Sequence, residues 1–368
     1  MKDFEFDYVP QISQETPKEP MEEQPTAAPA AEPTEAAPTV AESTSAPVVP
    51  PVDLRRERRQ FASIALGISF ITLYAVLVQL VAIAVIDAVA PQLARQDWYV
   101  IVLSMVPMYA VAMPLSIFFF RIGKAEPPTE KKKPGFLAIC GLICLCFALT
   151  YVGNFIGLII NAVISVFTGE APTNDLQNLT INTPLWANLL FCGILAPILE
   201  EIFYRKMVID RLRRYGDLAA VLISGILFGL IHGNFYQFFY ATFIGLLLGY
   251  VYLHTGRLRY SVLLHMSINL IGGVLMTEVS KRWDAEAISN NVMEFLAQNG
   301  WVVAVYLLYL FFILVCFIVA PIFIALSWKH IHFRRAEVKL RAGVFCKACL
   351  LNPAVWLLLL LLVLSFIG

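Results

Sequence analysis

The stretch PILEEIFYR at residues 197–205 places two adjacent carboxylates and a guanidinium inside an apolar run that begins near Leu185. An ionised side chain in hydrocarbon costs from roughly 2.5 to more than 10 kcal/mol, so a glutamate in that setting is a functional candidate. On a helix, Glu201 and Arg205 stand four residues apart in the favourable order, whereas Glu200 points about 100° away. The stretch therefore predicts a structural ion pair, Glu201 with Arg205, beside a carboxylate that is available for chemistry, Glu200.

The composition around this stretch is that of a membrane protein. Of the 368 residues, 59% are hydrophobic and 15% are charged, compared with about 25% charged residues in a typical soluble domain. The seven cysteines lie mostly in apolar runs, where cysteine behaves as a small hydrophobe, so no disulfide framework is expected. The expected fold is an all-α polytopic bundle in a membrane.

Apolar runs that suit membrane helices of about 20 residues follow one another from Phe61 onward. They lie at about 61–87, 98–120, 136–167, 184–204, 217–232, 234–254, 260–277, 301–328 and 350–368. The fifth and the ninth runs are short, so we expect about eight to nine transmembrane helices.

Residues 1–54 differ from the rest of the chain, because they are rich in Pro, Ala, Thr and Glu and contain few basic or aromatic residues. Such a segment buries too little apolar area to offset its ordering entropy, so we expect a disordered acidic tail. The first apolar run starts too far from the N-terminus for a signal peptide. The tail is therefore expected to stay attached.

Connections rich in Lys and Arg alternate along the chain with connections that contain few of these residues. The Lys and Arg residues concentrate at 55–59, 121–133, 205–214, 257–259 and 329–347. The connections near 88–97 and 168–183 carry one Lys or Arg between them, so the positive-inside rule predicts a cytosolic N-terminus. We expect an integral protein, with lipid as a partner and no nucleic-acid partner, in a prokaryotic plasma membrane.

These patterns divide the chain into four parts. After the cytosolic tail at 1–54, we expect N-terminal transmembrane helices at 55–183 and a transmembrane core at 184–277. The segment 278–368 is expected to hold C-terminal transmembrane helices and a basic cytosolic segment.

Polar side chains recur in the apolar runs that follow Glu200. His265 and Asn269 are four residues apart, which places both on one helical face. His232 ends a run in which small residues would let a neighbouring backbone come close. The small residues are Gly225, Gly229 and Gly233, and the next run adds Gly245 and Gly249.

One histidine or asparagine in a membrane often serves only as an interhelical hydrogen-bonding group. A glutamate, two histidines and an asparagine between residues 200 and 269 are poorly explained in that way. We therefore expect the four side chains to form one tightly packed polar centre.

The same residues resemble the motifs of a known family. Glu-Glu-x-x-x-Arg at 200–205, Phe-x-x-x-His at 228–232 and His-x-x-x-Asn at 265–269 are similar to the three motifs of the CPBP family. This family is the CAAX-protease and bacteriocin-processing, Abi-like group of intramembrane proteases. The resemblance covers about 184–277, and three motifs in order on successive apolar runs are more specific than any one alone.

The resemblance implies a glutamate-dependent intramembrane endopeptidase that acts on peptides or membrane-anchored proteins. It implies that Glu200 and His232 activate water, while His265 and Asn269 form an oxyanion hole. Fixed donors aimed at a developing oxyanion suit such a role in a low-dielectric site. We expect the catalytic core at 184–277 to open toward the cytosol.

Other interpretations stay open at the level of sequence. Glu200, His232 and His265 could ligate zinc, which favours histidine and carboxylate, although we expect no metal cofactor. A transporter, or a non-catalytic immunity or scaffold protein, could use the same polar centre for binding. A transporter would be expected to show internal repeats, and none is clear.

Two further features lie outside the main group. A weaker zinc set, with irregular spacing, consists of His330, His332, Cys346 and Cys349, for which free thiols are the simpler expectation. The second feature concerns the depth of His232 in the membrane, because this residue lies about fifteen residues, or roughly 22 Å of helix, beyond Asp217. To meet Glu200, the fifth helix must begin above the membrane plane or tilt strongly.

Overall fold

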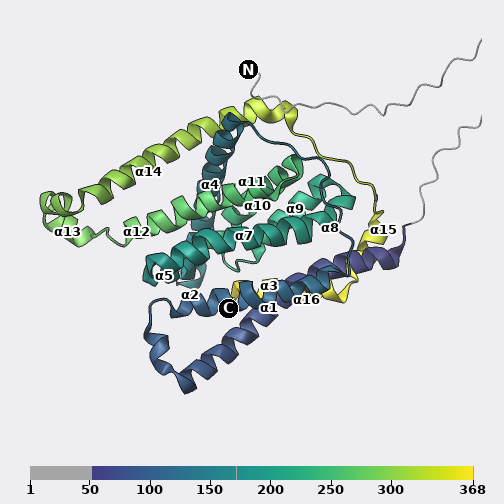
Figure 1. Cartoon of the computed structure of the whole chain (residues 1–368), viewed down its shortest axis with the longest axis horizontal. Helices are drawn as coiled ribbons and strands as arrows, with labels where there is room; N and C mark the ends of the chain where they lie inside the picture. The colour runs from purple at the N-terminus through teal and green to yellow at the C-terminus, as the bar shows by residue number, and fades with distance from the viewer. Residues whose placement is uncertain (1–51, 171, 368) are drawn as a thin grey trace, which may run out of the picture. The chain divides into compact units, whose positions relative to one another are not determined.

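The computed structural model describes residues 52–170 and 172–367, and every regular element in these ranges is helical (Figure 1). The predicted all-α fold is confirmed. The expected acidic tail lies outside the described residues, apart from its last three positions.

The helices follow the chain in this order. The first group is α1 (Leu54–Val89), η2 (Pro91–Arg95), α2 (Tyr99–Val106), η3 (Pro107–Ala112), α3 (Met113–Phe120), α4 (Phe136–Thr168) and α5 (Asp175–Asn182). The second is α6 (Leu185–Ala187), η4 (Asn188–Leu195), α7 (Ala196–Glu201), η5 (Ile202–Ile209), α8 (Asp210–Leu212), η6 (Arg213–Tyr215), α9 (Asp217–Leu230) and α10 (Phe235–Thr255). The third is α11 (Leu258–Ser267), η7 (Ile268–Leu275), α12 (Met276–Ser280), α13 (Ala285–Asn290), α14 (Val292–Ser327), η8 (Trp328–His330), α15 (Ala342–Phe345), η9 (Cys346–Leu350) and α16 (Pro353–Ile367).

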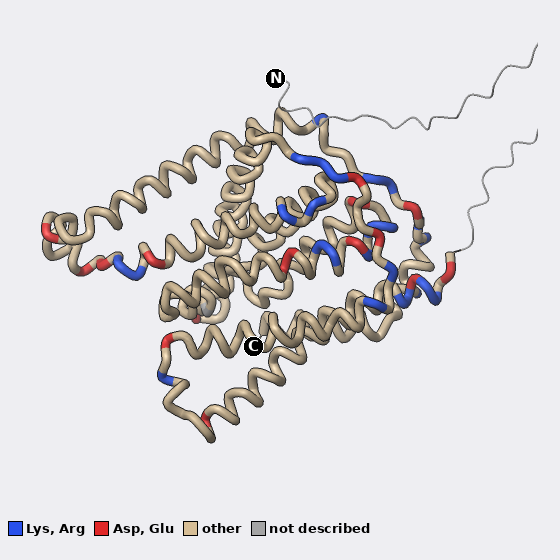
Figure 2. Tube along the Cα trace, in the orientation of Figure 1, with Lys and Arg blue, Asp and Glu red and all other residues tan. Residues whose placement is uncertain are grey.

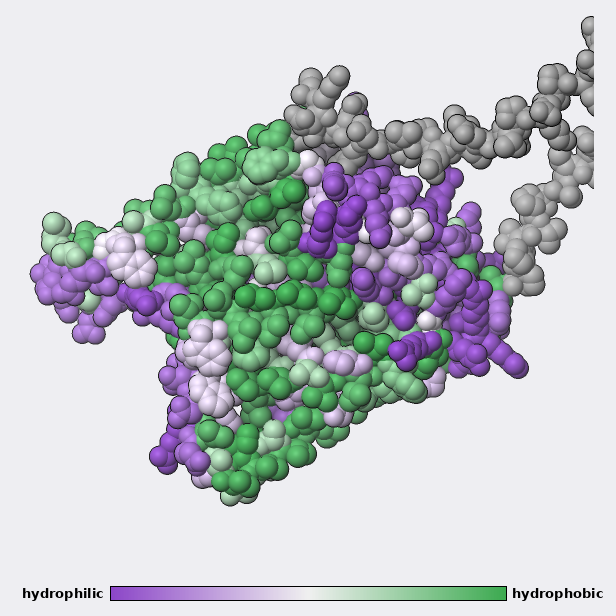
Figure 3. Space-filling view, in the orientation of Figure 1, coloured by the Kyte–Doolittle hydropathy of each residue, from purple (hydrophilic) through white to green (hydrophobic). Residues whose placement is uncertain are grey.

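Seven helices in the described ranges are long and apolar enough to cross a membrane. They are Leu54–Val89, Tyr99–Phe120, Phe136–Thr168, Leu185–Tyr215, Phe235–Thr255, Leu258–Ser280 and Val292–His330. The pair Ala342–Leu350 and Pro353–Ile367, bent by 66°, gives an eighth if it counts as one span. In space-filling view, apolar side chains cover most of the drawn surface of these helices (Figure 3).

Eight, and not nine, is the upper count because the fifth apolar run forms a short helix. Helix α9 has 14 residues, or about 21 Å at 1.5 Å per residue, whereas the hydrocarbon core is about 30 Å thick. Helix α9 packs along α10 and ends at the turn that carries His232.

Helices α9 and α10 approach closely because glycine faces glycine. A methyl group added to Gly245 would lie 2.9 Å from the Cα atom of Gly225 and 3.1 Å from the ring of Phe228. Burial of apolar surface does not drive association between helices in lipid, so close packing of this kind matters more. The sequence prediction from these glycines is confirmed.

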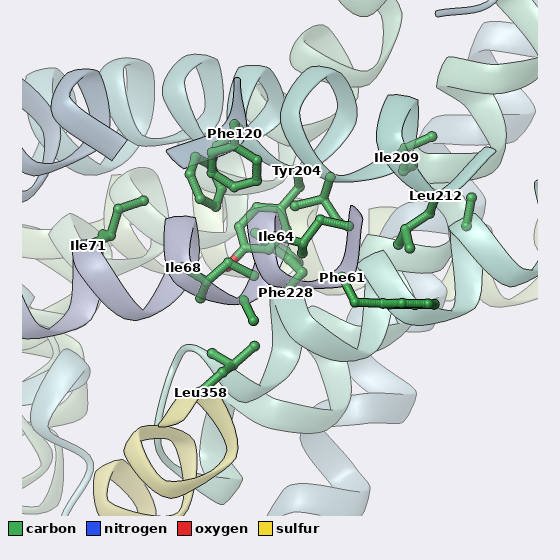
Figure 4. Packing of buried hydrophobic residues seen from close by; sticks show 14 of the residues in the cluster. Phe61, Ile64, Ile68, Ile71, Phe120, Tyr204, Ile209, Leu212, Phe228 and Leu358 are labelled. Atoms are coloured by element: carbon green, nitrogen blue, oxygen red, sulfur yellow. The ribbon is translucent and has the colours of Figure 1, made fainter. Parts of the chain in front are cut away.

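The packed core that supports the site joins α1, α3, η5 and α9 (Figure 4). The ring of Phe120 lies edge-on to that of Phe203 at 5.1 Å, and Tyr204 meets Phe228 in the same way at 5.0 Å. Ile68 of α1 is buried in this cluster. The cluster fixes η5 against α9, the two elements next to the motif glutamates and His232.

The basic segments are tied together in space (Figure 2). Glu126 N donates to Asp210 O at 2.7 Å, and Lys132 N donates to Thr255 O at 2.8 Å. Further bonds join Asp217 N to Arg334 O at 3.1 Å and Asn352 Nδ2 to Arg58 O at 2.9 Å. We call this region, made of the Lys- and Arg-rich segments at 55–59, 121–133, 210–214, 257–259 and 329–347, the basic face.

A second region consists of α5 and the residues that bond to its end, Asn188 and Lys281. We call this region the α5 face. Asn188 Nδ2 donates to Thr180 O at 2.7 Å, and Lys281 Nζ donates to Thr183 O at 2.6 Å. Helix α4 leads from the basic face toward this region over 33 residues, about 50 Å at 1.5 Å per residue. The two faces therefore lie at opposite ends of α4.

Candidate active site

Glu201 and Arg205 form the ion pair that the sequence predicts. Arg205 Nε donates to Glu201 Oε2 at 2.7 Å and Nη2 donates to Oε1 at 2.9 Å, with both side chains fully buried. Arg205 Nη1 also lies 3.4 Å from Ser224 Oγ in α9. A two-point bond of this kind fixes geometry as well as charge, so the pair holds η5 against α9.

His265 lies between the two motif glutamates. Its Nδ1 atom is 3.2 Å from Glu201 Oε1, and its Nε2 atom is 3.9 Å from Glu200 Oε2. Because the Glu201 carboxylate is an acceptor, Nδ1 carries the proton of that bond. The ion pair thus orients the imidazole, and Nε2 points toward the catalytic candidate.

His232 is placed by the turn between α9 and α10. Its Nδ1 atom is 2.7 Å from Phe228 O, and a carbonyl only accepts, so Nδ1 donates and Nε2 of the neutral ring carries the lone pair. Gly233, with φ of +66°, turns the chain back into α10 in a conformation that favours glycine. His232 is therefore held with its basic nitrogen free of the backbone.

The two imidazoles share one aromatic neighbour. The Phe228 ring meets His232 edge-on at 5.3 Å and His265 edge-on at 5.6 Å. Helix α9 ends at this point, so His232 lies at the depth of Glu200 in the wall of the same cavity. This arrangement answers the depth problem that the sequence poses.

Asn269 lies in the π-helical segment η7, one turn after His265. Its Nδ2 atom donates to Cys192 O in η4 at 2.9 Å. A carboxamide nitrogen has two hydrogens, so one donor remains after this bond. The π-helical segments η4 and η7 both line the cavity. Such segments often occur at functional sites.

Sequence reasoning missed Tyr109. This tyrosine in η3 is 6% exposed, and its hydroxyl donates to Glu200 Oε1 at 2.5 Å. Tyr109 lies in the second apolar run, far from the motifs, and no spacing rule links it to them. The only signal in the sequence was a tyrosine two residues after a proline.

A cavity of about 810 Å³ brings these groups together. Its walls include Tyr109, Glu200, His232, His265 and Asn269. Within 52–170 and 172–367, no three His, Cys, Asp or Glu side chains are grouped so that they could hold a metal ion. No such group forms within the weaker zinc set of the sequence, which consists of His330, His332, Cys346 and Cys349.

Comparison with known proteins gives a family for the motif-bearing segment. Residues 182–271 match the family described as "Type II CAAX prenyl endopeptidase Rce1-like". This match contains all three motifs and confirms the resemblance. No solved structure matches the chain.

Three relatives share part of the sequence. The chain is 28% identical over 91 residues to "Putative membrane peptidase YdiL" of Bacillus subtilis (strain 168), over 24% of this chain and 37% of the relative. It is 32% identical over 102 residues to "UPF0177 protein YbdJ" of Lactococcus lactis subsp. lactis (strain IL1403), over 27% of this chain and 44% of the relative. For "UPF0177 protein YxdF" of the same strain, the identity is 24% over 136 residues, 37% of this chain and 73% of the relative. The chain thus spans less than half the length of the first two.

Proposed function

We propose that this chain, whose core from residue 182 to 271 matches the Rce1-like family, is an intramembrane endopeptidase of the glutamic type. The observation that carries the proposal is the placement of Glu200 and both imidazoles on one cavity within a helical membrane core. The proposed substrate is a peptide or a membrane-anchored protein. The proposed location is a prokaryotic plasma membrane, with the basic face in the cytosol.

In the proposed reaction, Glu200 and His232 activate a water molecule. Glu200 takes a proton from the water, helped by the lone pair on His232 Nε2, and the resulting hydroxide attacks the scissile carbonyl carbon. The proton then passes to the amine as the C–N bond breaks. Proton transfer by positioned groups of this kind typically contributes about 10²–10⁴-fold.

His265 and Asn269 would stabilise the oxyanion of the tetrahedral intermediate. Asn269 offers the hydrogen that Cys192 O does not use. With Nδ1–H directed at Glu201, His265 presents Nε2 toward Glu200 and would donate to the oxyanion from this nitrogen when Nε2 carries a proton. The Glu201–Arg205 pair is therefore a positioning element for His265.

The decisive test is Glu200→Gln, assayed with fluorogenic peptides in membranes and compared with Glu286→Gln, which changes a glutamate in α13 outside the cavity. We expect Glu200→Gln to lower turnover about 10²–10⁴-fold with an unchanged melting temperature. A folded Glu200→Gln protein that cleaves at the native rate would refute the proposal. A chelator in the same assay tests the zinc alternative, and we expect no loss of activity.

A further inference from the structure

Most of the cavity wall lies on the α5 side of Glu200, and Phe147 and Ile244 line the cavity on the other side. Its walls beyond the motif residues come from Thr150 to Leu158 of α4, from Gln177 and Thr180 of the α5 region, and from Gly272 to Thr277 of η7 and α12. All of these lie toward the α5 face.

The opposite direction is closed by buried side chains. Between Glu200 and the basic face, η5 contributes Arg205, Val208 and Ile209, each 0% exposed. Leu248 and Tyr252 of α10, 0% and 3% exposed, fill the same level from the neighbouring helix. Close packing of this kind leaves no path for a peptide from the basic face.

The wall of the cavity also reaches the lipid-facing side of α4. Phe155 and Leu158 line the cavity and are 65% and 56% exposed. Around them the lining is polar but uncharged, with Asn154 and Gln177 as examples. Such walls suit an extended peptide that is continuous with an apolar membrane anchor.

The α5 region forms a roof at this end. Tyr236 Oη, at the start of α10, donates to Pro172 O at 2.9 Å, and the bonds from Asn188 and Lys281 hold the end of α5. The basic face is at the other end of α4, and segments rich in Lys and Arg remain in the cytosol. The roof therefore lies on the extracytoplasmic side.

We infer that the substrate reaches Glu200 from the α5 face, so that it is a membrane-anchored polypeptide whose scissile bond lies on the extracytoplasmic side of its anchor. This inference rests on the proposed peptidase function and names its substrate class. It replaces the cytosolic opening that the sequence suggested. A cytosolic C-terminal tail is not the substrate that this geometry selects.

Accessibility of single thiols to a membrane-impermeant, cationic methanethiosulfonate reagent tests the inference. All seven native cysteines are first replaced by alanine. Gly273→Cys then places one thiol in the cavity, where an added Cβ meets nothing within 4 Å. A second protein retains only Cys346, which is exposed on the basic face, as the matched control.

We expect the reagent to label Gly273→Cys at least about tenfold faster in intact cells than in inverted vesicles, because hydrocarbon excludes a charged reagent. The Cys346 control should show the reverse. Labelling of both thiols from the same side would overturn the inference. So would a Gly273→Cys thiol that stays unlabelled from both sides while Thr180→Cys, on α5, is labelled in intact cells, because the cavity would then be sealed.

Thiol labelling does not require turnover, so it separates this inference from the proposed function. If Glu200→Gln retained full activity while the cavity thiol was labelled from outside, the peptidase mechanism would fail and the route of access would stand. If Glu200→Gln lost activity and the cavity thiol was labelled only in inverted vesicles, the peptidase mechanism would stand and access from the α5 face would be refuted.

Discussion

Glu200 has two different neighbours on its two oxygen atoms. Tyr109 donates to Oε1 at 2.5 Å, and His265 Nε2 lies 3.9 Å from Oε2. Hydrogen bonds to charged groups contribute about 1.5–3 kcal/mol. The Tyr109 bond therefore both stabilises the carboxylate and fixes the direction in which its second oxygen points.

Tyr109→Phe removes this bond and leaves the ring in place. We expect kcat to fall about 10–100-fold, because the 1.5–3 kcal/mol of a charge-assisted bond converts to that range at 1.36 kcal/mol per tenfold. KM should change little, because the ring keeps its place in the wall of the cavity.

Tyr151→Phe is the matched control for that variant. Tyr151 lines the same cavity, but its hydroxyl bonds to Tyr309 at 3.0 Å. An equal loss of kcat in both variants would show that Tyr109 acts only through general packing of the cavity.

At the scale of elements, the buried ion pair joins the motif helix to α9 and to His265. Arg205→Met leaves the Glu201 carboxylate buried without its partner, which typically costs about 3–5 kcal/mol. We expect a large drop in the melting temperature in detergent. The double variant Glu201→Leu with Arg205→Met should recover most of that stability, because it removes both charges.

The double variant should nevertheless remain inactive, because His265 Nδ1 would lose its acceptor at Glu201 Oε1. Thermal unfolding and turnover, measured on the same preparations, separate the two effects. Full activity in the stable double variant would contradict the positioning role of the pair.

Close contact between α9 and α10 sets the position of His232. Gly245→Val would press a side chain against Gly225 and Phe228, and overpacking typically costs about 1–3 kcal/mol. We expect lower stability and a larger loss of activity, because any shift of α9 moves His232. Gly273→Ala is the control for stability, since its added methyl group meets nothing within 4 Å.

The sequence predicted some of these features and not others. The Glu201–Arg205 pair and the glycine contacts follow from spacing along a single helix or between adjacent helices, so both were predictable. The length of α9 was not, because hydropathy alone does not distinguish a run that crosses the bilayer from one that ends inside the protein. Tyr109 was also beyond prediction, because its bond to Glu200 joins segments 91 residues apart.

At the scale of the whole membrane core, the orientation does not depend on whether α9 crosses the bilayer. Helix α9 leaves the basic face at Asp217, and α10 returns there, since Thr255 O accepts from Lys132 N at 2.8 Å. The hairpin therefore adds an even number of crossings. The later helices therefore have the orientation that the nine runs of the sequence predict. The count of eight spans includes α10 and not α9, so it is one crossing short for this hairpin.

Reporter fusions test this orientation. A fluorescent protein fused after residue 128, 216 or 256 should fluoresce, because each position lies on the basic face and Lys- and Arg-rich connections stay in the cytosol. Alkaline phosphatase fused after residue 97 or 170 should be active, because that enzyme folds only outside the cytosol. Active phosphatase after residue 256, together with fluorescence after residue 216, would mean that α9 and α10 cross an odd number of times. The basic face could not then be a single cytosolic surface, even though hydrogen bonds hold its segments together.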